Sequence, residues 1–335
     1  MAEPTPATAQ ADLERLNQDL GVLTEAIAGA VVGQKRVVEG ILTCLLAGGH
    51  GLLEGVPGLG KTLLIRTLAA AVSLRFSRIQ FTPDLMPADI VGTSVLTQGD
   101  GGLERRLEFQ PGPVFANIVL ADEINRATPK TQSALLEAMA EGQVTAGGQT
   151  RELPTPFLVL ATQNPLEQEG TYPLPEAQLD RFMLKIHVDF PNEDELMAIL
   201  DLTTGERMPE PSAVLEGPRL LEMQRLVRGI PTTKSLTRYV VRVLRATHPD
   251  DPNAPDLVRR YVRFGGSPRG AQAMLIAARI RCAMQGRLSP SVDDVRATAI
   301  PALRHRVILN FEGEAEQIAH DDILDQVLST VRVDD

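Results

Sequence analysis

Apolar residues recur at spacings of three and four up to about residue 50, which is the pattern of helices that bury one face. The first stripe predicts an amphipathic helix, interrupted or bent near Gly21, and consists of Leu13, Leu16, Leu20, Leu23 and Ile27. After the turn at residues 32–34, a second helix is predicted by Val37, Val38, Ile41, Leu42 and Leu45. Residues 1–10, rich in Ala, Thr and Pro, are predicted to be a disordered lead-in.

Short apolar runs bounded by turn residues follow, and they predict buried strands. These runs cover residues 51–53, 76–81, 117–123, 157–161 and 183–188. Helical patterns are predicted at residues 62–72 and 128–141, between some of these runs. Two hairpins are predicted as well, one from residues 91–96 and 103–109, the other at residues 143–153. Each hairpin is either a contact element or a plain surface feature.

The helical pattern returns in the last third of the chain, after a boundary predicted at Pro191 and a proline-rich connection. The sequence therefore predicts two domains, which the length of 335 residues also favours. The predicted division is a lead-in at 1–10, an α/β core at 11–191, a linker at 192–218 and an α-helical lid at 219–335.

Composition narrows the classes of function. The net charge of −10 and a pI near 5.1 argue against a protein that grips nucleic acid through a broad basic surface. The longest apolar run, residues 41–47, is too short to span a bilayer, and the N-terminus lacks a signal-peptide pattern. Cys44 and Cys282 lie in apolar helical patterns and are expected to be reduced core residues. We therefore expect a cytoplasmic protein without membrane insertion.

One motif has the form of a phosphate-binding loop, with two glycines five residues apart followed directly by Lys and Thr. It reads Gly55-Val56-Pro57-Gly58-Leu59-Gly60-Lys61-Thr62 and lies between a predicted strand and a predicted helix. In this context the backbone N–H groups and the N-terminus of the helix bind phosphate. The motif predicts that Lys61 reaches the β- and γ-phosphates of ATP and that Thr62 binds Mg²⁺.

A second motif is the apolar run that ends in Asp122 and Glu123 about 60 residues after the loop. This is the Walker B pattern. It predicts that Asp122 holds Mg²⁺ through water and that Glu123 acts as the base for the attacking water. The strand at residues 157–161 also ends in polar residues, and one of these side chains is expected near the γ-phosphate.

Over residues of roughly 20–320 the order of the motifs resembles the AAA+ ATPases, and within them the MoxR family. Besides the phosphate-binding loop, the resemblance is carried by Val32-Gly33-Gln34, Asp122-Glu123-Ile124-Asn125-Arg126-Ala127, Ala161-Thr162-Gln163-Asn164-Pro165, Pro175-Glu176-Ala177-Gln178-Leu179-Asp180-Arg181-Phe182 and Ser267-Pro268-Arg269. It implies an α/β fold, an AAA+ P-loop NTPase with a five-stranded parallel sheet flanked by helices, plus a smaller all-α lid.

The resemblance also implies roles for single residues. It makes Asn164 sensor 1, Arg269 sensor 2 and Arg181 an arginine finger. It further implies that the segment 32–34, namely Val32, Gly33 and Gln34, contacts the nucleotide, and that Gly55, Pro57, Gly58 and Gly60 form its phosphate cradle. A finger acts in trans on the ATP of a neighbouring copy, so a homo-oligomeric ring, typically a hexamer, would be a condition of activity.

MoxR-like proteins are regarded as chaperone-type ATPases that mature or remodel other proteins, commonly with a von Willebrand factor A (VWA) domain partner. The sequence shows no such domain, so the resemblance implies a partner acting in trans, with metal or cofactor insertion as one outcome. The two hairpins look like the helix-2 insert and pre-sensor hairpin of this group and would face the pore or a partner.

Three alternatives remain. One is a nucleotide-gated scaffold whose slow hydrolysis is only a timer. Another is a DNA-associated motor or transcription activator, which the acidic composition and the absence of a recognisable DNA-binding motif oppose. A motor subunit like that of magnesium chelatase has a similar fold, and only its partners would distinguish it.

Overall fold

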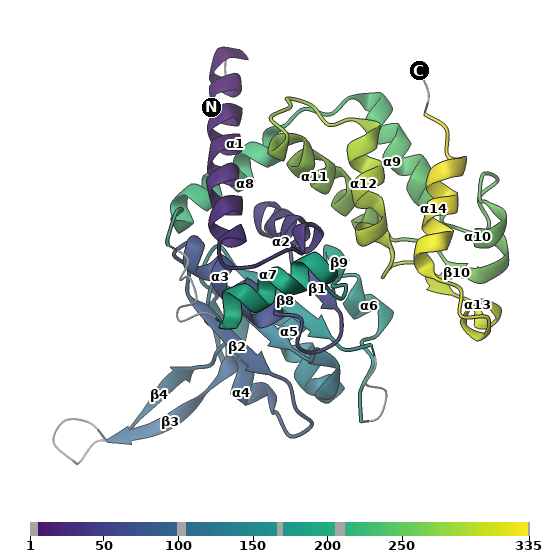
Figure 1. Cartoon of the computed structure of the whole chain (residues 1–335). Helices are drawn as coiled ribbons and strands as arrows, with labels where there is room; N and C mark the ends of the chain where they lie inside the picture. Colours follow the sequence, from purple (N-terminus) through teal and green to yellow (C-terminus); the bar gives the residue numbers. More distant parts are fainter. Residues whose placement is uncertain (1–5, 99–104, 166–169, 205–211, 334–335) are drawn as a thin grey trace.

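A five-stranded parallel sheet lies at the centre of the N-terminal body of the computed structural model, which describes residues 6–98, 105–165, 170–204 and 212–333 (Figure 1). The strands follow the order β2-β5-β8-β1-β9, and each neighbouring pair is parallel. Their bounds are β1 (Gly51–Glu54), β2 (Phe76–Gln80), β5 (Ile118–Asp122), β8 (Leu158–Gln163) and β9 (Leu184–His187). Each predicted apolar run forms one of these strands, so the predicted sheet is confirmed.

Helices cover both faces of this sheet because successive strand residues point to opposite sides. Leu53 and Leu160 belong to a core shared with α1 (Pro6–Ala28), α2 (Lys35–Ala47) and α3 (Lys61–Ala71). Leu52 and Val159 belong to a second core, shared with α4 (Pro87–Val91) and α5 (Pro129–Glu141). The carboxyl ends of the strands are therefore held between two packed layers.

The lid is mainly helical and lies beside the body (Figure 1). Its elements are α8 (Gly217–Gly229), α9 (Lys234–Ala246), α10 (Asp256–Tyr261), β10 (Val262–Phe264), α11 (Pro268–Met284), α12 (Val292–Leu303), β11 (Ile308–Leu309), α13 (Phe311–Ala315) and α14 (His320–Thr330). Strands β10 and β11 pair antiparallel, so the expectation of an all-α lid is corrected by a small two-stranded sheet.

Both predicted hairpins are present. Strands β3 (Gly92–Gln98) and β4 (Arg105–Pro111) form a long antiparallel arm that projects from the body in Figure 1. The predicted turn of this arm lies outside the described residues. A shorter hairpin is formed by β6 (Gln143–Ala146) and β7 (Gln149–Glu152). The remaining elements are the 3₁₀ helix η1 (Ile124–Arg126), α6 (Glu176–Leu179) and α7 (Glu193–Thr204).

The structure differs from the predicted segments in three places. Helix α1 begins at Pro6, so residues 6–10 are helical rather than disordered, while residues 1–5 lie outside the described part. The same helix continues through Gly21, where a break or bend was expected. The predicted linker at 192–218 contains a whole helix, α7.

The two cysteines lie where the sequence predicts. Cys44 and Cys282 are buried and free, as expected. Within the described ranges no helix is long and apolar enough to cross a membrane.

Candidate functional site

The phosphate-binding loop connects β1 to α3 and leaves room for a ligand above its glycines. Gly58 and Gly60 have φ angles of 86° and 74°, a left-handed conformation that glycine adopts without strain. A Cβ atom built on either would meet nothing within 4 Å. Because α3 begins at Lys61, the free N–H groups of its first turn are available to an anion in that space. The loop therefore fits the phosphates of a nucleotide.

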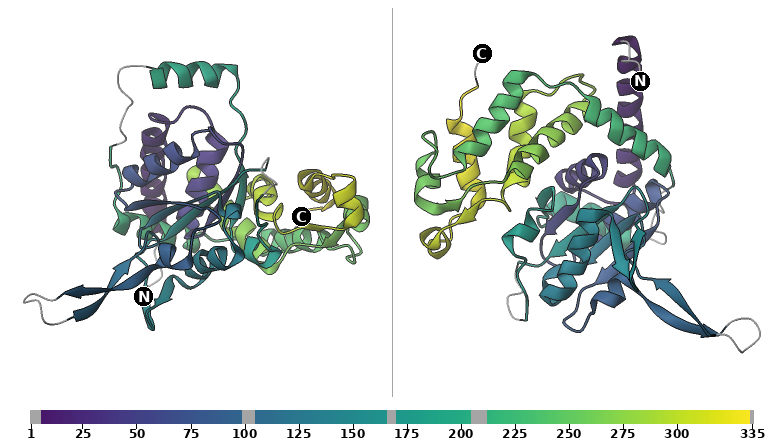
Figure 2. Two further views of the ribbon diagram at one scale, coloured as in Figure 1. Left: turned by 90° about the horizontal axis from the view of Figure 1, so that it is seen from below. Right: turned by 180° about the vertical axis from the view of Figure 1, so that it is seen from behind.

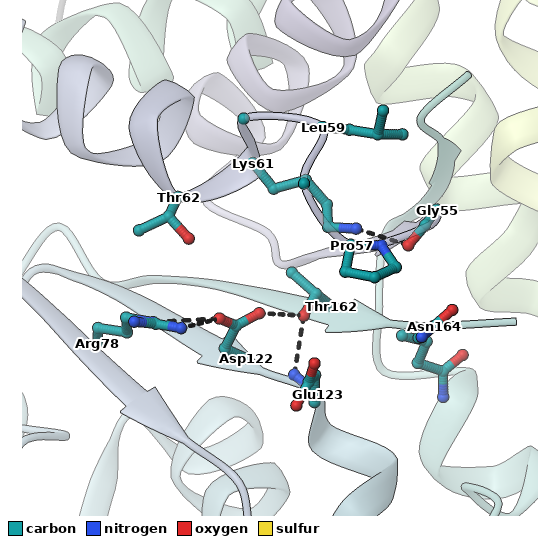
Figure 3. Close-up of a pocket in the computed structure, with 13 residues that line it drawn as sticks. Gly55, Pro57, Leu59, Lys61, Thr62, Arg78, Asp122, Glu123, Thr162 and Asn164 are labelled. Atoms are coloured by element: carbon teal, nitrogen blue, oxygen red, sulfur yellow. Dashed lines mark hydrogen bonds and ion pairs between the residues drawn. The ribbon is translucent and has the colours of Figure 1, made fainter. Parts of the chain in front are cut away.

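A cavity of about 230 Å³ lies over this loop and the carboxyl ends of β5 and β8 (Figure 3). It brings together nine of the predicted site residues: Gly55, Pro57, Gly58, Gly60, Lys61, Thr62, Asp122, Glu123 and Asn164. Leu59, Arg78, Thr162 and Gln163 complete its lining. Residues far apart in the sequence thus form one site because parallel strands end at the same edge of the sheet.

Lys61 folds back over the loop. Its Nζ donates hydrogen bonds to the carbonyl oxygens of Gly55 and Val56, at 2.6 and 2.8 Å. Burial lowers the pKa of this amino group, and the nearby carboxylates of Asp122 and Glu123 partly offset that effect. The ammonium group is held by two neutral acceptors that a phosphate would replace with a charged one.

One hydroxyl connects the two acidic residues of the site. Thr162 Oγ1 donates to Asp122 Oδ1 at 2.6 Å and accepts from the backbone N–H of Glu123 at 2.8 Å (Figure 3). Glu123 has a left-handed backbone with φ of 56°, an uncommon conformation for a residue with a side chain. The hydrogen bond from Thr162 to β5 therefore fixes both carboxylates at the turn after the strand.

The opposite sides of the two carboxylates are held by basic and amide groups. The guanidinium of Arg78 donates to Asp122 Oδ2 at 2.6 Å, and Gln80 Nε2 donates to Glu123 Oε2 at 2.8 Å. Arg126 forms an ion pair of 3.0 Å with the same Glu123 oxygen. Arg78 and Gln80 lie two residues apart on β2, beside β5, so they point to one side of the sheet.

The segment 32–34 lies beside the loop rather than in the lining of the cavity. Gln34 Nε2 donates to the carbonyl of Leu59 at 2.9 Å, while its Oε1 atom is buried and has no partner among the described residues. Gly33 lies against Glu195. An unpartnered buried oxygen beside the phosphate-binding loop suits the amino group of a base, whereas Val32 makes no recorded polar contact in the described structure.

Arg181 and Arg269 lie outside the cavity lining. Arg181 follows α6, and its guanidinium donates to the carbonyl of Leu136 on α5. Arg269 is the second residue of α11 and forms an ion pair of 3.4 Å with Asp180, next to Arg181 in the chain. The structure therefore places the two arginines on adjoining segments and does not bring them into the cavity of their own chain.

Comparison with known proteins fits this site. Residues 50–184 match the family described as "ATPase family associated with various cellular activities (AAA)", and residues 255–327 match the AAA lid domain. Chaperone MoxR1 of Mycobacterium tuberculosis is 44% identical over 90% of this chain and 78% of its own. Protein MoxR of Methylorubrum extorquens is 32% identical over 91% of this chain and 92% of its own. The chain belongs to the MoxR family of AAA+ ATPases.

A solved structure gives the same result for the fold. A putative ATPase from Cytophaga hutchinsonii superposes with a TM-score of 0.91 at 38% identity, covering 98% of this chain and 99% of the other. The two-domain MoxR architecture, its binding of nucleotide and its hydrolysis of ATP are thereby shown at the level of the family.

The local sequence pattern predicts no role for Arg78, Gln80 and Thr162. Thr162 belongs to the motif at residues 161–165, but its position opposite the acidic strand depends on the pairing of β5 with β8. A signal for the other two exists in the sequence, because Arg78 and Gln80 alternate with apolar residues in a predicted strand.

Proposed function

We propose that the chain is a motor that hydrolyses ATP in a homo-oligomeric ring and uses the energy to remodel, mature or activate a partner protein complex. The supporting observation is the separation of Arg181 from the cavity that holds the other candidate catalytic groups. An arginine finger that lies outside the nucleotide cavity of its own copy suits action on the cavity of a neighbouring copy. A hexamer is the proposed form of the ring.

Each residue of the cavity has a proposed part in hydrolysis. Lys61 leaves its two carbonyl partners to bind the β- and γ-phosphates, and the N-terminus of α3 binds the same anion. Thr62 and Asp122 are proposed to hold Mg²⁺, which neutralises charge on the phosphates. Glu123 takes the proton of the attacking water, and Asn164 orients that water as sensor 1.

The arginines are proposed to act between copies or through the lid. Arg181 neutralises charge on the γ-phosphate of the neighbour, and Arg269 acts as sensor 2, reporting the position of the lid. Asp180, whose carboxylate contacts Arg269, is the link between them.

The two hairpins are proposed to contact the partner and to transmit the conformational change that ATP hydrolysis causes in the ring. The β3–β4 arm carries exposed Leu96 and Leu107, which lie opposite each other in its register. Apolar side chains at this place suit contact with a protein rather than with nucleic acid. We propose a VWA-domain protein acting in trans as the partner, in the cytoplasm, with metal or cofactor insertion as one outcome of the remodelling.

The test uses two inactive variants that are defective on opposite sides of an interface. Arg181→Ala is expected to bind ATP normally and to hydrolyse it about 10³- to 10⁵-fold more slowly. Lys61→Ala is expected to bind ATP about 10- to 100-fold more weakly but to keep a working finger. Mixing the two chains should restore part of the ATPase rate, because some interfaces then combine an intact cavity with an intact Arg181.

The control is a mixture in which both chains carry Arg181→Ala and one also carries Lys61→Ala, because it contains no intact finger. Recovery in the first mixture alone supports the ring. Equal inactivity of both mixtures would contradict action in trans.

A second candidate is a nucleotide-gated scaffold with slow hydrolysis. It is favoured by the contacts of Glu123, whose Oε2 atom is occupied by Gln80 and Arg126 and is less available to a water molecule. The ATPase rate per copy, measured over a wide range of protein concentration with Mg²⁺, separates the two. A rate that rises and saturates favours the ring motor, whereas tight binding with a flat, near-zero rate favours the scaffold.

A further inference from the structure

Helix α7 has no buried residue, unlike the other helices of comparable length in the described part of the chain. The left view of Figure 2 shows it standing off the body. Its N-terminal end is anchored, since the N–H of Glu195 bonds Asn192 Oδ1 at 3.0 Å and Glu195 Oε1 lies 3.4 Å from the N atom of Gln34. The helix is thus formed and positioned, but its outer face is uncovered.

The exposed face of α7 is a seam of the kind that packs against another helix. Glu193, Met197, Leu200 and Thr204 are all exposed and follow each other at spacings of four, three and four residues. Met197 and Leu200 are each 58% exposed at the centre of this seam. Helix pairs bury such seams against each other, so water contact at these two side chains is unfavourable in an isolated copy.

A matching face exists on α9 of the lid. Lys234, Arg238, Val241 and Arg245 are exposed and repeat the spacings of four, three and four residues. Val241, at the centre, is 46% exposed. The inner face of α9 packs within the lid through Leu236, Val240 and Val243, so its outer face is left for another partner.

The charges of the two helices are opposite. Helix α7 carries four acidic residues and no basic ones, namely Glu193, Asp194, Glu195 and Asp201. Helix α9 carries four basic residues and no acidic ones, namely Lys234, Arg238, Arg242 and Arg245. Within the described ranges neither Lys234 nor Arg238 forms an ion pair, so their charges are available to a partner. Opposite charges around an apolar centre favour binding between these two surfaces over binding to other surfaces.

We propose that α7 of one copy docks on α9 of a second copy of this chain. The two helices belong to different parts of one molecule, α7 beside the body and α9 in the lid (Figures 1 and 2). A contact between two different surfaces is head-to-tail and repeats from copy to copy, closing into a ring when the rotation permits. A single helix pair buries less than the roughly 800 Å² per partner of a stable interface, so this contact is one part of the larger subunit boundary. This inference adds a specific contact to the proposed ring. It rests on that proposal, because the repeated contact closes only if the copies form a ring.

Charge reversal tests the contact without touching the cavity. Asp201→Lys on α7 and Arg238→Glu on α9 are both at exposed positions. Each alone is expected to raise the dissociation constant between copies at least about tenfold, measured by sedimentation with a non-hydrolysable ATP analogue, because like charges then face each other. An equal mixture of the two variants should recover assembly, since every contact pairs opposite charges where the two variants alternate. Arg238→Lys, which keeps the charge, and Glu25→Lys, an exposed reversal on α1, are expected to assemble like the wild type.

Cross-linking gives a second readout. Leu200→Cys in one tagged chain and Val241→Cys in another should be joined by a short bismaleimide, since the native cysteines are buried. A chain carrying Val22→Cys, exposed on α1, is the control and should not be joined to Leu200→Cys.

The outcomes separate this inference from the proposed function. If the wild type assembles but the reversals change nothing and the control cross-links as readily, the α7–α9 contact is overturned while the ring stands. If the wild type stays monomeric and its ATPase rate does not depend on concentration, both the ring and the contact are overturned.

Discussion

Arg306, which is almost fully buried, forms an ion pair with Asp180 that joins the lid to the body, and its Nε donates to Asp180 Oδ1 at 2.8 Å. The guanidinium also donates to the carbonyl oxygens of Asp180, Phe182 and Met183 in the body, and to that of Ala302 in the last turn of α12. Ser267 donates to the same Asp180 oxygen at 2.6 Å. The lid is therefore fastened to the segment that carries Arg181.

Removing this arginine should destabilise the protein strongly. The side chain of Arg306 is 2% exposed, so Arg306→Met removes one donor from the Asp180 carboxylate and the guanidinium donors from several carbonyl groups. We expect a loss of about 3–5 kcal/mol in the free energy of unfolding, measured by urea denaturation. Arg269→Met is the matched control, since Arg269 pairs with the same Asp180 but is 56% exposed, and it should cost no more than about 1 kcal/mol. Equal losses in the two variants would contradict the fastening role of Arg306.

Thr162 should be needed for the geometry of the acidic pair. The side chain is buried, and Thr162→Val keeps its shape while removing the acceptor of the Glu123 N–H and the donor to Asp122. We expect a stability loss of about 1–3 kcal/mol from the unsatisfied groups. The Mg²⁺ concentration for half-maximal ATPase rate should rise, because Asp122 loses one of the two side chains that orient it.

The control for Thr162→Val is Thr43→Val, which removes a buried hydroxyl whose bond is local to α2. It should leave the Mg²⁺ dependence unchanged. A shift of the same size in both variants would show a general loss of stability instead of a role at the site.

Lys61 and Glu123 should separate binding from hydrolysis. Lys61→Ala removes the ammonium group, which would leave the two carbonyl oxygens to bind phosphate. The ATP affinity measured by calorimetry should therefore fall about 10- to 100-fold. Glu123→Gln keeps the size of the side chain and should bind ATP normally while slowing turnover about 10²- to 10⁴-fold. Normal turnover in Glu123→Gln would mean that another group activates the water.

The parts of this protein that sequence predicts well are local. The phosphate-binding loop, the acidic strand end and the five strands each follow from neighbouring residues, and the structure contains each of them within a residue or two. The order of the strands depends instead on long-range pairing, so the bond of Thr162 to β5 and the place of Arg78 beside Asp122 could not be read from local pattern.

Tertiary packing explains the differences. Helix α1 continues through Gly21 although glycine costs about 1 kcal/mol in a helix. Leu20 and Leu23, on either side, are almost fully buried, and their burial outweighs that cost. Helix α7 was missed for a different reason, because its apolar residues lie beside a proline-rich stretch that marks the whole segment as a connection.

His50 should make the stability of the protein sensitive to acid. Its ring is buried, with Nε2 3.0 Å from the carbonyl of Met139 and Nδ1 accepting from the N–H of Val159 at 3.0 Å. Burial lowers the pKa of His50 to about 4, although the bond to Met139 opposes this shift. Protonation at Nδ1 would place two N–H groups against each other, so the folded state favours the neutral ring.

The unfolded state therefore binds more protons than the folded state between the ordinary histidine pKa near 6.5 and the folded value near 4. The contribution of His50 is fully present above the upper value and is lost as the pH falls through this window, by up to about 3 kcal/mol. Urea unfolding at a series of pH values from 7 to 4 should show a shallower loss for His50→Asn, which cannot titrate, than for the wild type. His248→Asn, at an exposed histidine, should follow the wild-type curve, and an unchanged slope in His50→Asn would assign the acid sensitivity to other groups.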